Sequence, residues 1–193
     1  MKANGNTDIL LAGVGGQGIV LASGILANIC LAAGYDVKQS EVHGMAQRGG
    51  SVTSHVRFGE KVNSPTIAQG EADYMLGFEL LESLRWTDFL AQDGIAIVNT
   101  QKIDPITVSS GAMEYPDDLQ ERIQARCNQP VLMDAFTIAQ EAGSARAVNM
   151  ALLGGLSKHL DFPLEVWEKG IRNRVPPKTF DANWTAFSAG RKL

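Results

Sequence analysis

Apolar and polar residues follow one another along the chain in blocks that predict short buried strands separated by helices. Short unbroken apolar runs are typical of buried strands, while apolar residues three or four positions apart are typical of helices. The strands predicted in this way are 8–12, 35–40, 51–58, 72–78, 95–99 and 130–134, and Thr107 with Val108 suggests the start of one more. The predicted helices are 19–33, 80–91, 117–127, 137–160 with an interruption near Gly143, 163–174 and 180–190.

The order of these segments predicts an α/β fold. Strands that alternate with helices build a mainly parallel sheet with helices on both faces. The segment 51–58 differs, because its apolar residues alternate with Thr53, His55 and Arg57, which is the period of a half-exposed strand. We therefore expect it to be an antiparallel edge strand. The glycine pair 154–155, inside a predicted helix, indicates close packing of another backbone.

Length and charge restrict the class of protein. The 193 residues fit one domain, 1–193, in which 161–193 form a C-terminal helical segment. Lys plus Arg number 17 and Asp plus Glu number 21, which gives a net charge of −4. A protein with this charge lacks the excess of basic residues that nucleic-acid-binding proteins carry. No charged residue occurs between Ile9 and Tyr35, but a glycine cluster divides this stretch into a strand and a helix. We therefore expect no membrane span and a soluble, cytoplasmic protein.

The cysteine count argues against a metal centre carried by this chain alone. An iron–sulfur cluster normally takes four thiolates, and a structural zinc site takes four Cys or His ligands. Cys30 and Cys127 are the only cysteines, and the three histidines show no ligand spacing. We expect Cys30, on the apolar side of a helix, to be an inert core residue and Cys127, at a helix end, to be more accessible. Two isolated thiols fit a reducing compartment.

The first motif with chemical potential is a turn of the form G-x-G-x-x-G. It comprises Gly13, Gly15, Gly16, Gln17 and Gly18. The turn follows a predicted strand and opens a predicted helix, where glycines let backbone N–H groups approach an anion. A nicotinamide site also needs an acid about 20 residues further on. Lys38 occupies that position, Asp36 lies too early, and Glu41 falls at or beyond the strand end. Three interpretations stay open: a nucleotide or phosphate site, another anionic or protein ligand, or close packing of helix and strand.

The second motif is the segment 41–50, with the sequence EVHGMAQRGG. Its candidate site residues are Glu41, His43, Gln47, Arg48 and Gly49. A loop of this kind at the carboxyl end of a strand is where open α/β sheets place their sites. The guanidinium can bind a carboxylate or phosphate, and the imidazole can transfer a proton near neutral pH. The alternative is that Arg48 pairs with Glu41 while His43 caps the loop.

Other candidates have less specific patterns. His55 and Arg57 share one strand face, which is usually solvated or part of an interface. Four aromatic residues near the C-terminus fit either the core or a partner interface. They are Trp167, Phe180, Trp184 and Phe187. The chain has no nucleophile elbow, metal-ligand spacing or Walker loop, so no catalytic residue is assigned.

Taken together, these motifs resemble one known family. The turn GVGGQG, the loop EVHGMAQRGGSVTSHVRFG at 41–59 and three further elements resemble the gamma-type subunit of 2-oxoacid:ferredoxin oxidoreductases. The further elements are Ser64-Pro65, Gly70-Glu71-Ala72-Asp73 and Asn183-x-x-Ala186-Phe187-x-x-Gly190. The sequence His-Gly-Met-Ala-Gln-Arg-Gly-Gly is most similar to the indolepyruvate branch, in its beta subunit. The resemblance extends in order over nearly the whole chain.

The resemblance implies a subunit role and a reaction. In this family a 2-oxoacid is decarboxylated on thiamine diphosphate, 4Fe-4S clusters carry electrons to ferredoxin, and coenzyme A takes the acyl group. In the indolepyruvate branch the larger alpha subunit carries the thiamine site and the clusters. The family fold is a Rossmann-like α/β domain without a nicotinamide. The resemblance therefore implies that this chain binds no cofactor alone, and that its two glycine loops contact the partner or coenzyme A.

Two kinds of alternative remain at this point. The chain could serve another 2-oxoacid, such as pyruvate or 2-oxoglutarate, because the substrate pocket is expected on the partner. It could instead be a nucleotide-binding oxidoreductase that uses NAD, or an assembly module whose loops only dock another protein. The acid that an NAD site needs is missing after the second strand.

Overall fold

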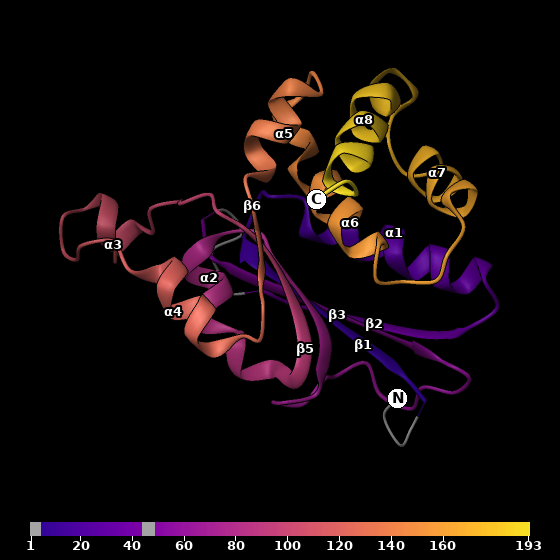
Figure 1. The fold of residues 1–193 in the computed structure, drawn as a ribbon, viewed down its shortest axis with the longest axis horizontal. Coiled ribbons are helices and arrows are strands. Elements are labelled where there is room, and N and C mark those ends of the chain that lie inside the picture. Colours follow the sequence, from indigo (N-terminus) through magenta and orange to yellow (C-terminus); the bar gives the residue numbers. More distant parts are fainter. Residues whose placement is uncertain (1–4, 44–48) are drawn as a thin grey trace.

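A six-stranded mixed sheet forms the centre of the molecule (Figure 1). The computed structural model describes residues 5–43 and 49–193. The strands occur in the order β2-β3-β1-β4-β5-β6, and β3 runs antiparallel to both of its neighbours while the other pairs are parallel. Their bounds are β1 Thr7–Val14, β2 Asp36–His43, β3 Ser51–Gly59, β4 Ala72–Gly77, β5 Leu90–Asn99 and β6 Val131–Met133.

Helices cover both faces of this sheet, as the sequence predicts. One face carries α1 Ile19–Ala32, α5 Ala135–Glu141, α6 Val148–Ser157, α7 Leu164–Arg172 and α8 Phe180–Gly190. The other carries α2 Leu80–Arg85 and α4 Leu119–Arg126, with the short α3 Ile106–Ser109 beside them. The described residues also form three 3₁₀ turns: η1 Thr87–Phe89, η2 Ala145–Ala147 and η3 Pro177–Thr179. Strand alternation supplies both cores, since Ile9 and Leu11 face the first and Leu10 faces the second.

The strand β3 has the predicted direction but not the predicted position. It lies between β1 and β2, so the edge of the sheet is β2. All of β3 after Ser51 is buried. The expectation of a half-exposed edge strand is wrong, because the segment 60–71 covers the polar face of β3 and places Ile67 in the second core.

Two further segments differ from the predicted elements. The helix predicted over 80–91 ends at Arg85, and Leu90 already pairs with Ala72 in the β4–β5 ladder, so strand pairing overrides the helical spacing. Thr107 and Val108 lie in the helix α3 rather than in a strand.

The predicted close packing at the glycine pair 154–155 is confirmed. A Cβ atom on Gly154 would lie 2.0 Å from the carbonyl oxygen of Phe187 in α8. A Cβ atom on Gly190 would likewise lie 2.0 Å from the carbonyl oxygen of Ala151 in α6. The helices α6 and α8 therefore cross with their backbones in contact, and no larger residue fits at either position without moving a helix.

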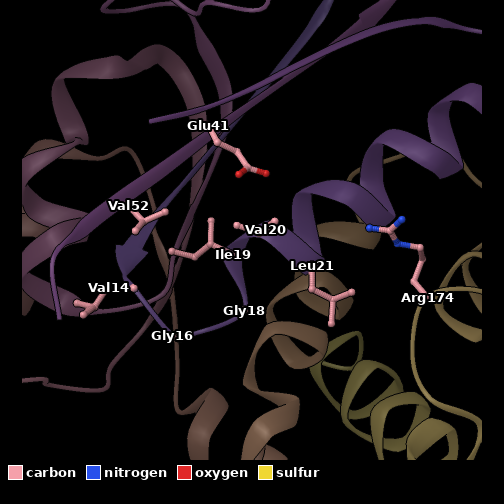
Figure 2. Close-up of a pocket in the computed structure, with 10 residues that line it drawn as sticks. Val14, Gly16, Gly18, Ile19, Val20, Leu21, Glu41, Val52 and Arg174 are labelled. Atoms are coloured by element: carbon pink, nitrogen blue, oxygen red, sulfur yellow. The ribbon is translucent and has the colours of Figure 1, made fainter. Parts of the chain in front are cut away.

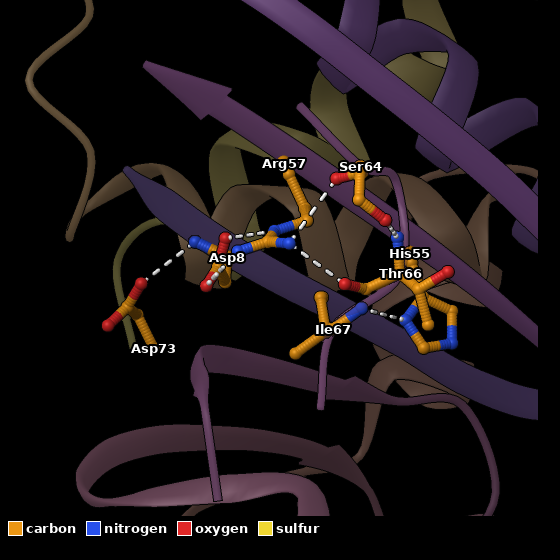
Figure 3. A network of polar contacts seen from close by, with 7 residues as sticks. All are labelled: Asp8, His55, Arg57, Ser64, Thr66, Ile67 and Asp73. Carbon is orange, nitrogen blue, oxygen red and sulfur yellow. Dashed lines mark hydrogen bonds and ion pairs between the residues drawn. The ribbon is translucent and has the colours of Figure 1, made fainter. Parts of the chain in front are cut away.

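A buried ion pair joins β1, β3 and the segment that covers them (Figure 3). The Arg57 guanidinium donates to both carboxylate oxygens of Asp8, from Nε at 2.7 Å and from Nη2 at 3.3 Å. Its Nη1 donates to the carbonyl oxygens of Thr66, at 2.8 Å, and Ser64, at 3.3 Å. Asp73 accepts a hydrogen bond from the backbone N–H of Asp8 at 2.8 Å. Arg57 therefore has a structural role, because it joins β3 to β1 and to the covering segment. It is not the solvated or interface residue that the strand pattern suggested.

His55 belongs to the same buried layer. Its Nδ1 accepts a hydrogen bond of 3.1 Å from the backbone N–H of Ile67, so the imidazole is uncharged in this arrangement. Burial, together with the charge of Arg57, holds the pKa of the imidazole below its ordinary value. The side chain is 4% exposed, which excludes it from a solvated face.

Replacing Arg57 with alanine should lower the free energy of unfolding by about 3–5 kcal/mol, because Asp8 would stay buried after losing its guanidinium partner. Denaturant unfolding followed by circular dichroism measures this change. The control is Arg122→Ala, whose pair with Asp118 is exposed and should contribute at most about 0.5 kcal/mol. Similar losses in the two variants would contradict a structural role for the buried pair.

The lowered pKa of His55 predicts a stability that falls in mild acid. Below about pH 6.5 the unfolded chain binds a proton at this position before the folded chain does. Stability linked to His55 is therefore complete above that pH and is lost as the pH falls towards the folded pKa. Urea unfolding of wild type and His55→Asn across this range should give a shallower pH dependence for the variant, since asparagine keeps an acceptor but does not titrate. Equal slopes would refute the assignment.

Candidate functional site

The glycine turn connects β1 to α1, in the strand–turn–helix context that the sequence predicts. Gly18 adopts the left-handed conformation, with φ 80°, directly before the first residue of α1. A Cβ atom at Gly18 would lie 2.6 Å from Nδ2 of Asn149, which donates to the Gly18 carbonyl oxygen at 3.3 Å. Gly13 also approaches another element closely, since a Cβ atom there would lie 2.6 Å from Cβ of Phe78. Close packing therefore accounts for two of the glycines.

Gly15, one of the two remaining turn glycines, contacts the end of the second motif. The N–H of Gly15 donates to the carbonyl oxygen of Gly50 at 2.9 Å, and the N–H of Gly49 donates to the carbonyl oxygen of Gly15 at 3.4 Å. Gly16, with φ 107°, has open space where a Cβ atom would project. The fold thus brings together two motifs that are separated in sequence.

The structure places the other predicted residues of the second motif only in part. Glu41 is exposed near the end of β2, where its Oε1 accepts a hydrogen bond of 3.3 Å from Nε2 of Gln39. The backbone of His43 ends β2, while its side chain falls outside the described part of the chain. Gln47 and Arg48 also lie outside the described residues.

The side chain of Gln17 bridges the ends of two neighbouring strands. Its Oε1 accepts from the backbone N–H of Val14, and its Nε2 donates to the carbonyl oxygen of Phe78, each at 2.8 Å. Asn99 donates to the same carbonyl at 3.0 Å and accepts from the N–H of Ala135 at 3.1 Å. Side-chain amides therefore tie together the carboxyl ends of β1, β4 and β5 and the start of α5.

A cavity of about 600 Å³ opens beside the glycine turn, between α1, β2 and β3 (Figure 2). Its walls are mostly aliphatic, while a carboxylate from β2 and a guanidinium from the segment after α7 flank it. The lining residues are Val14, Gly15, Gly16, Gly18, Ile19, Val20, Leu21, Glu41, Val52 and Arg174. Three of the predicted turn residues and Glu41 thus share one concave surface, which suits an apolar group more than a free ion.

A second, smaller cavity of about 370 Å³ lies on the other side of the turn. Gly16, Gln17 and Gly18 form one wall, and Arg146 and Asn149 contribute to another. Asn149 is 2% exposed, and its Oδ1 has no hydrogen-bond partner among the residues that the structure describes. This amide oxygen can accept a hydrogen bond from a group that enters the cavity.

The geometry disfavours a dinucleotide at this turn. In open α/β sheets the nucleotide lies in the crevice outside the carboxyl ends of adjacent parallel strands, with an acid on the second strand binding the ribose. Here Gln17 spans the ends of β1 and β4, and β3 separates β2 from β1. An acid at the end of β2 is therefore displaced by one strand spacing, about 4.8 Å, from its usual place.

The two cysteines lie on opposite faces of the sheet. Cys30, on the buried side of α1, belongs to the core between that helix and the sheet, whereas Cys127, directly after α4, belongs to the core on the other face. Both are free and buried, so the expected accessibility of Cys127 is wrong. Burial raises the pKa of both thiols, that of Cys30 to about 12. The pair cannot ligate one cluster, and within residues 5–43 and 49–193 no group of His, Cys, Asp or Glu could hold a metal ion.

Asn149 and Arg174 are among the cavity residues that were not predicted from the sequence. Asn149 stands alone as a polar residue within an apolar helical stretch, which is the only signal that could have singled it out. Arg174 carries no sequence signal, because it follows α7 in a segment without a recognisable pattern.

The described helices include none that combines the length and apolarity required to cross a bilayer.

Comparisons with known proteins place the whole chain in one family. The sequence pattern described as pyruvate ferredoxin/flavodoxin oxidoreductase matches residues 8–193. The chain is 42% identical to the indolepyruvate oxidoreductase subunit IorB of Thermococcus kodakarensis over 190 residues, which cover 96% of this chain and 94% of that protein.

Solved structures share the fold. The pyruvate oxidoreductase subunit PORC of Thermotoga maritima has a TM-score of 0.74 at 26% identity, with 97% of this chain and 96% of that chain covered. A 2-oxoglutarate:ferredoxin oxidoreductase from Magnetococcus marinus has a TM-score of 0.70 at 20% identity. The match covers 97% of this chain but 30% of that chain, so the same fold there forms one part of a longer polypeptide.

The bridging role of Gln17 can be tested by Gln17→Leu. Leucine removes the acceptor of the Val14 N–H and the donor to Phe78, so the free energy of unfolding should fall by about 1–3 kcal/mol. Chemical unfolding measures the loss, and Gln120→Leu on the exposed side of α4 is the matched control. A variant as stable as wild type would mean that water replaces the amide at no cost.

Proposed function

This chain belongs to the pyruvate ferredoxin/flavodoxin oxidoreductase family, and we propose that it is the small, non-redox subunit of an indolepyruvate (aryl-pyruvate):ferredoxin oxidoreductase. The proposal is carried by one observation. The fold joins its two family loops, GVGGQG and the Gly-Gly end of EVHGMAQRGG, through the Gly15–Gly50 and Gly49–Gly15 hydrogen bonds, beside a cavity of about 600 Å³. The same chain keeps its two thiols on opposite faces of the sheet.

The relatives support the indolepyruvate branch over others. Identity to the indolepyruvate oxidoreductase subunit IorB is 42% over nearly the full length of both chains, against 33% over 153 residues to the pyruvate/ketoisovalerate oxidoreductases common subunit gamma of Pyrococcus abyssi. The alternative is a gamma subunit that serves pyruvate or 2-oxoglutarate, which the shared fold allows. The NAD-dependent alternative is disfavoured, because Gln17 spans the strand ends where a dinucleotide would lie.

In the proposed complex the redox groups belong to the larger subunit. Thiamine diphosphate and 4Fe-4S clusters there supply the decarboxylation and the electron transfer to ferredoxin, and coenzyme A takes the acyl group. This chain cannot ligate a cluster, because its two cysteines are separated by the sheet. Two buried free thiols also fit the reducing conditions of a cytoplasm.

The residues that we assign to contact with the larger subunit or coenzyme A are those of the two loops. They are Gly15, Gly16, Gln17, Gly18, Glu41, His43, Gln47, Arg48 and Gly49. Gly13, which the sequence analysis grouped with them, is buried against Phe78 and is left out of this assignment. The start of α1 suits an anionic group, because helix N-terminal N–H groups lack partners within the helix. The aliphatic walls beside it suit an apolar chain and exclude water. We assign no proton transfer to this chain.

Reconstitution tests the proposal directly. The purified chain alone should not oxidise indolepyruvate with an artificial electron acceptor, whereas addition of the larger subunit, thiamine diphosphate and coenzyme A should produce turnover. The assembled enzyme should prefer indolepyruvate to pyruvate and 2-oxoglutarate by roughly tenfold or more in kcat/KM.

Three outcomes would contradict the proposal or its substrate. Substantial turnover by the isolated chain would end the subunit assignment. A preference for pyruvate or 2-oxoglutarate in the assembled enzyme would favour the other branch. Saturable NAD binding to the isolated chain, followed through the fluorescence of Trp86, Trp167 and Trp184, would favour the nicotinamide alternative.

A further inference from the structure

The contact between the two glycine motifs is made by backbone alone. The β1–β3 ladder ends at the pair Val14–Ser51. Beyond this pair, the N–H of Gly15 donates to the carbonyl oxygen of Gly50, and the N–H of Gly49 donates to the carbonyl oxygen of Gly15. Glycines offer no side chain to pack, and the last pairs of a ladder open more readily than its centre. The position of this contact therefore depends on the residues next to it.

A buried carboxylate of α2 holds the first side chain after the contact. Glu82 is 4% exposed, and its Oε2 accepts a hydrogen bond of 2.5 Å from Oγ of Ser51. Its Oε1 accepts from Nη1 of Arg85 at 2.6 Å. Both carboxylate oxygens thus have partners, as a buried charge requires. Among the residues that the structure describes, Glu82 is the one hydrogen-bond partner of the Ser51 side chain.

The helix that carries Glu82 is firmly held. Leu80 and Leu84 are buried in the core on this face of the sheet. At the start of the helix, the carboxylate of Glu79 accepts from the backbone N–H of Glu82 at 2.9 Å and from the N–H of Ile103 at 3.2 Å. Glu82 therefore reaches Ser51 from a fixed position.

The location of Glu82 excludes a direct role in binding a ligand at the turn. The described residues that line the two cavities beside the turn do not include it. Its effect on the motifs must pass through Ser51. On the other strand, Gln17 holds the backbone N–H of Val14 at the same end of the ladder. One side chain thus fixes each of the two strands where the motifs touch.

We infer that Glu82 is a positioning residue that, through Ser51, holds the Gly49–Gly50 end of the second motif against Gly15. The inference rests on the proposed function, since this contact belongs to the loops assigned to the larger subunit or coenzyme A. Without the Ser51–Glu82 hydrogen bond, the end of the second motif moves away from the turn. Binding through the loops then weakens, while no reacting group changes.

Amide hydrogen exchange in the full chain, followed by NMR, tests the positioning. Glu82→Ala and Ser51→Ala should each speed exchange of the Gly15 N–H by roughly tenfold or more, because each removes a hydrogen bond to a carboxylate. The double variant should exchange no faster than either single variant, since both remove the same bond. Glutamine keeps an oxygen that can accept from Ser51, so Glu82→Gln should lie between Glu82→Ala and wild type.

The matched control is Thr87→Val, beyond the other end of α2. The Thr87 hydroxyl donates to the carbonyl oxygen of Leu84 at 2.9 Å, so this variant also loses a buried hydrogen bond but leaves Ser51 and Glu82 in place. Exchange of the Gly15 N–H should match wild type. An equal acceleration in Thr87→Val would mean general loosening of the chain and would overturn the inference.

The assembled enzyme provides the functional measurement. Turnover is measured against the concentrations of the larger subunit and of coenzyme A. In Ser51→Ala and Glu82→Ala, at least one of the two half-saturating concentrations should rise by roughly tenfold, with kcat at saturation near wild type. Thr87→Val should match wild type in all of these quantities.

The outcomes separate this inference from the proposed function. Unchanged Gly15 exchange in both Ser51→Ala and Glu82→Ala overturns the inference and leaves the subunit assignment standing. Faster exchange with unchanged half-saturating concentrations also overturns it, because the contact between the motifs would then not serve binding. If the wild-type chain gives no turnover with the larger subunit, the proposed function fails and the functional part of the inference fails with it, while the exchange rates still decide whether Glu82 fixes the contact.

Discussion

The antiparallel pairing of β3 with β1 is the constraint on which the rest of the molecule depends. It inserts a strand between β1 and β2, and it buries Arg57 between two strands where a charge is costly unless it is paired. Asp8, on the facing strand, supplies that pairing, and the segment 60–71 supplies carbonyl oxygens for the remaining guanidinium N–H groups. The ion pair therefore fixes the register of β1 against β3 and holds the covering segment in place.

This register also explains why the two glycine loops meet. In an antiparallel pair one strand starts where its neighbour ends, and here Ser51 is opposite Val14. The chain that enters β3 must therefore arrive beside the turn that leaves β1, which places Gly49 and Gly50 against Gly15. If the third strand were parallel to β1, it would begin beside the first residues of β1 and not beside its last ones. The second motif, which precedes this strand, would then lie far from the glycine turn. The candidate site is thus a consequence of strand direction.

Much of the fold could be predicted from local pattern, and the failures have physical causes. The opening strand, turn and helix were predicted because the glycine cluster divides an uncharged stretch, and the family resemblance that these residues carry is confirmed. The position of β3 was not predictable from the sequence. The alternation of apolar and polar residues is the same whether Arg57 faces water or pairs with an aspartate 49 residues away. The meeting of the two motifs depended on that position. Arg174 reaches the cavity through the packing of α7 against α1, which leaves no trace in sequence spacing.

The placement of the two cysteines bears on how an enzyme of this kind withstands oxygen. Oxidants attack the thiolate form of an accessible cysteine, and here burial suppresses that form at both positions. Both thiols are consequently protected from oxidation near neutral pH. Among the described residues, an oxidant would reach the exposed thioether of Met113 before it reached either cysteine.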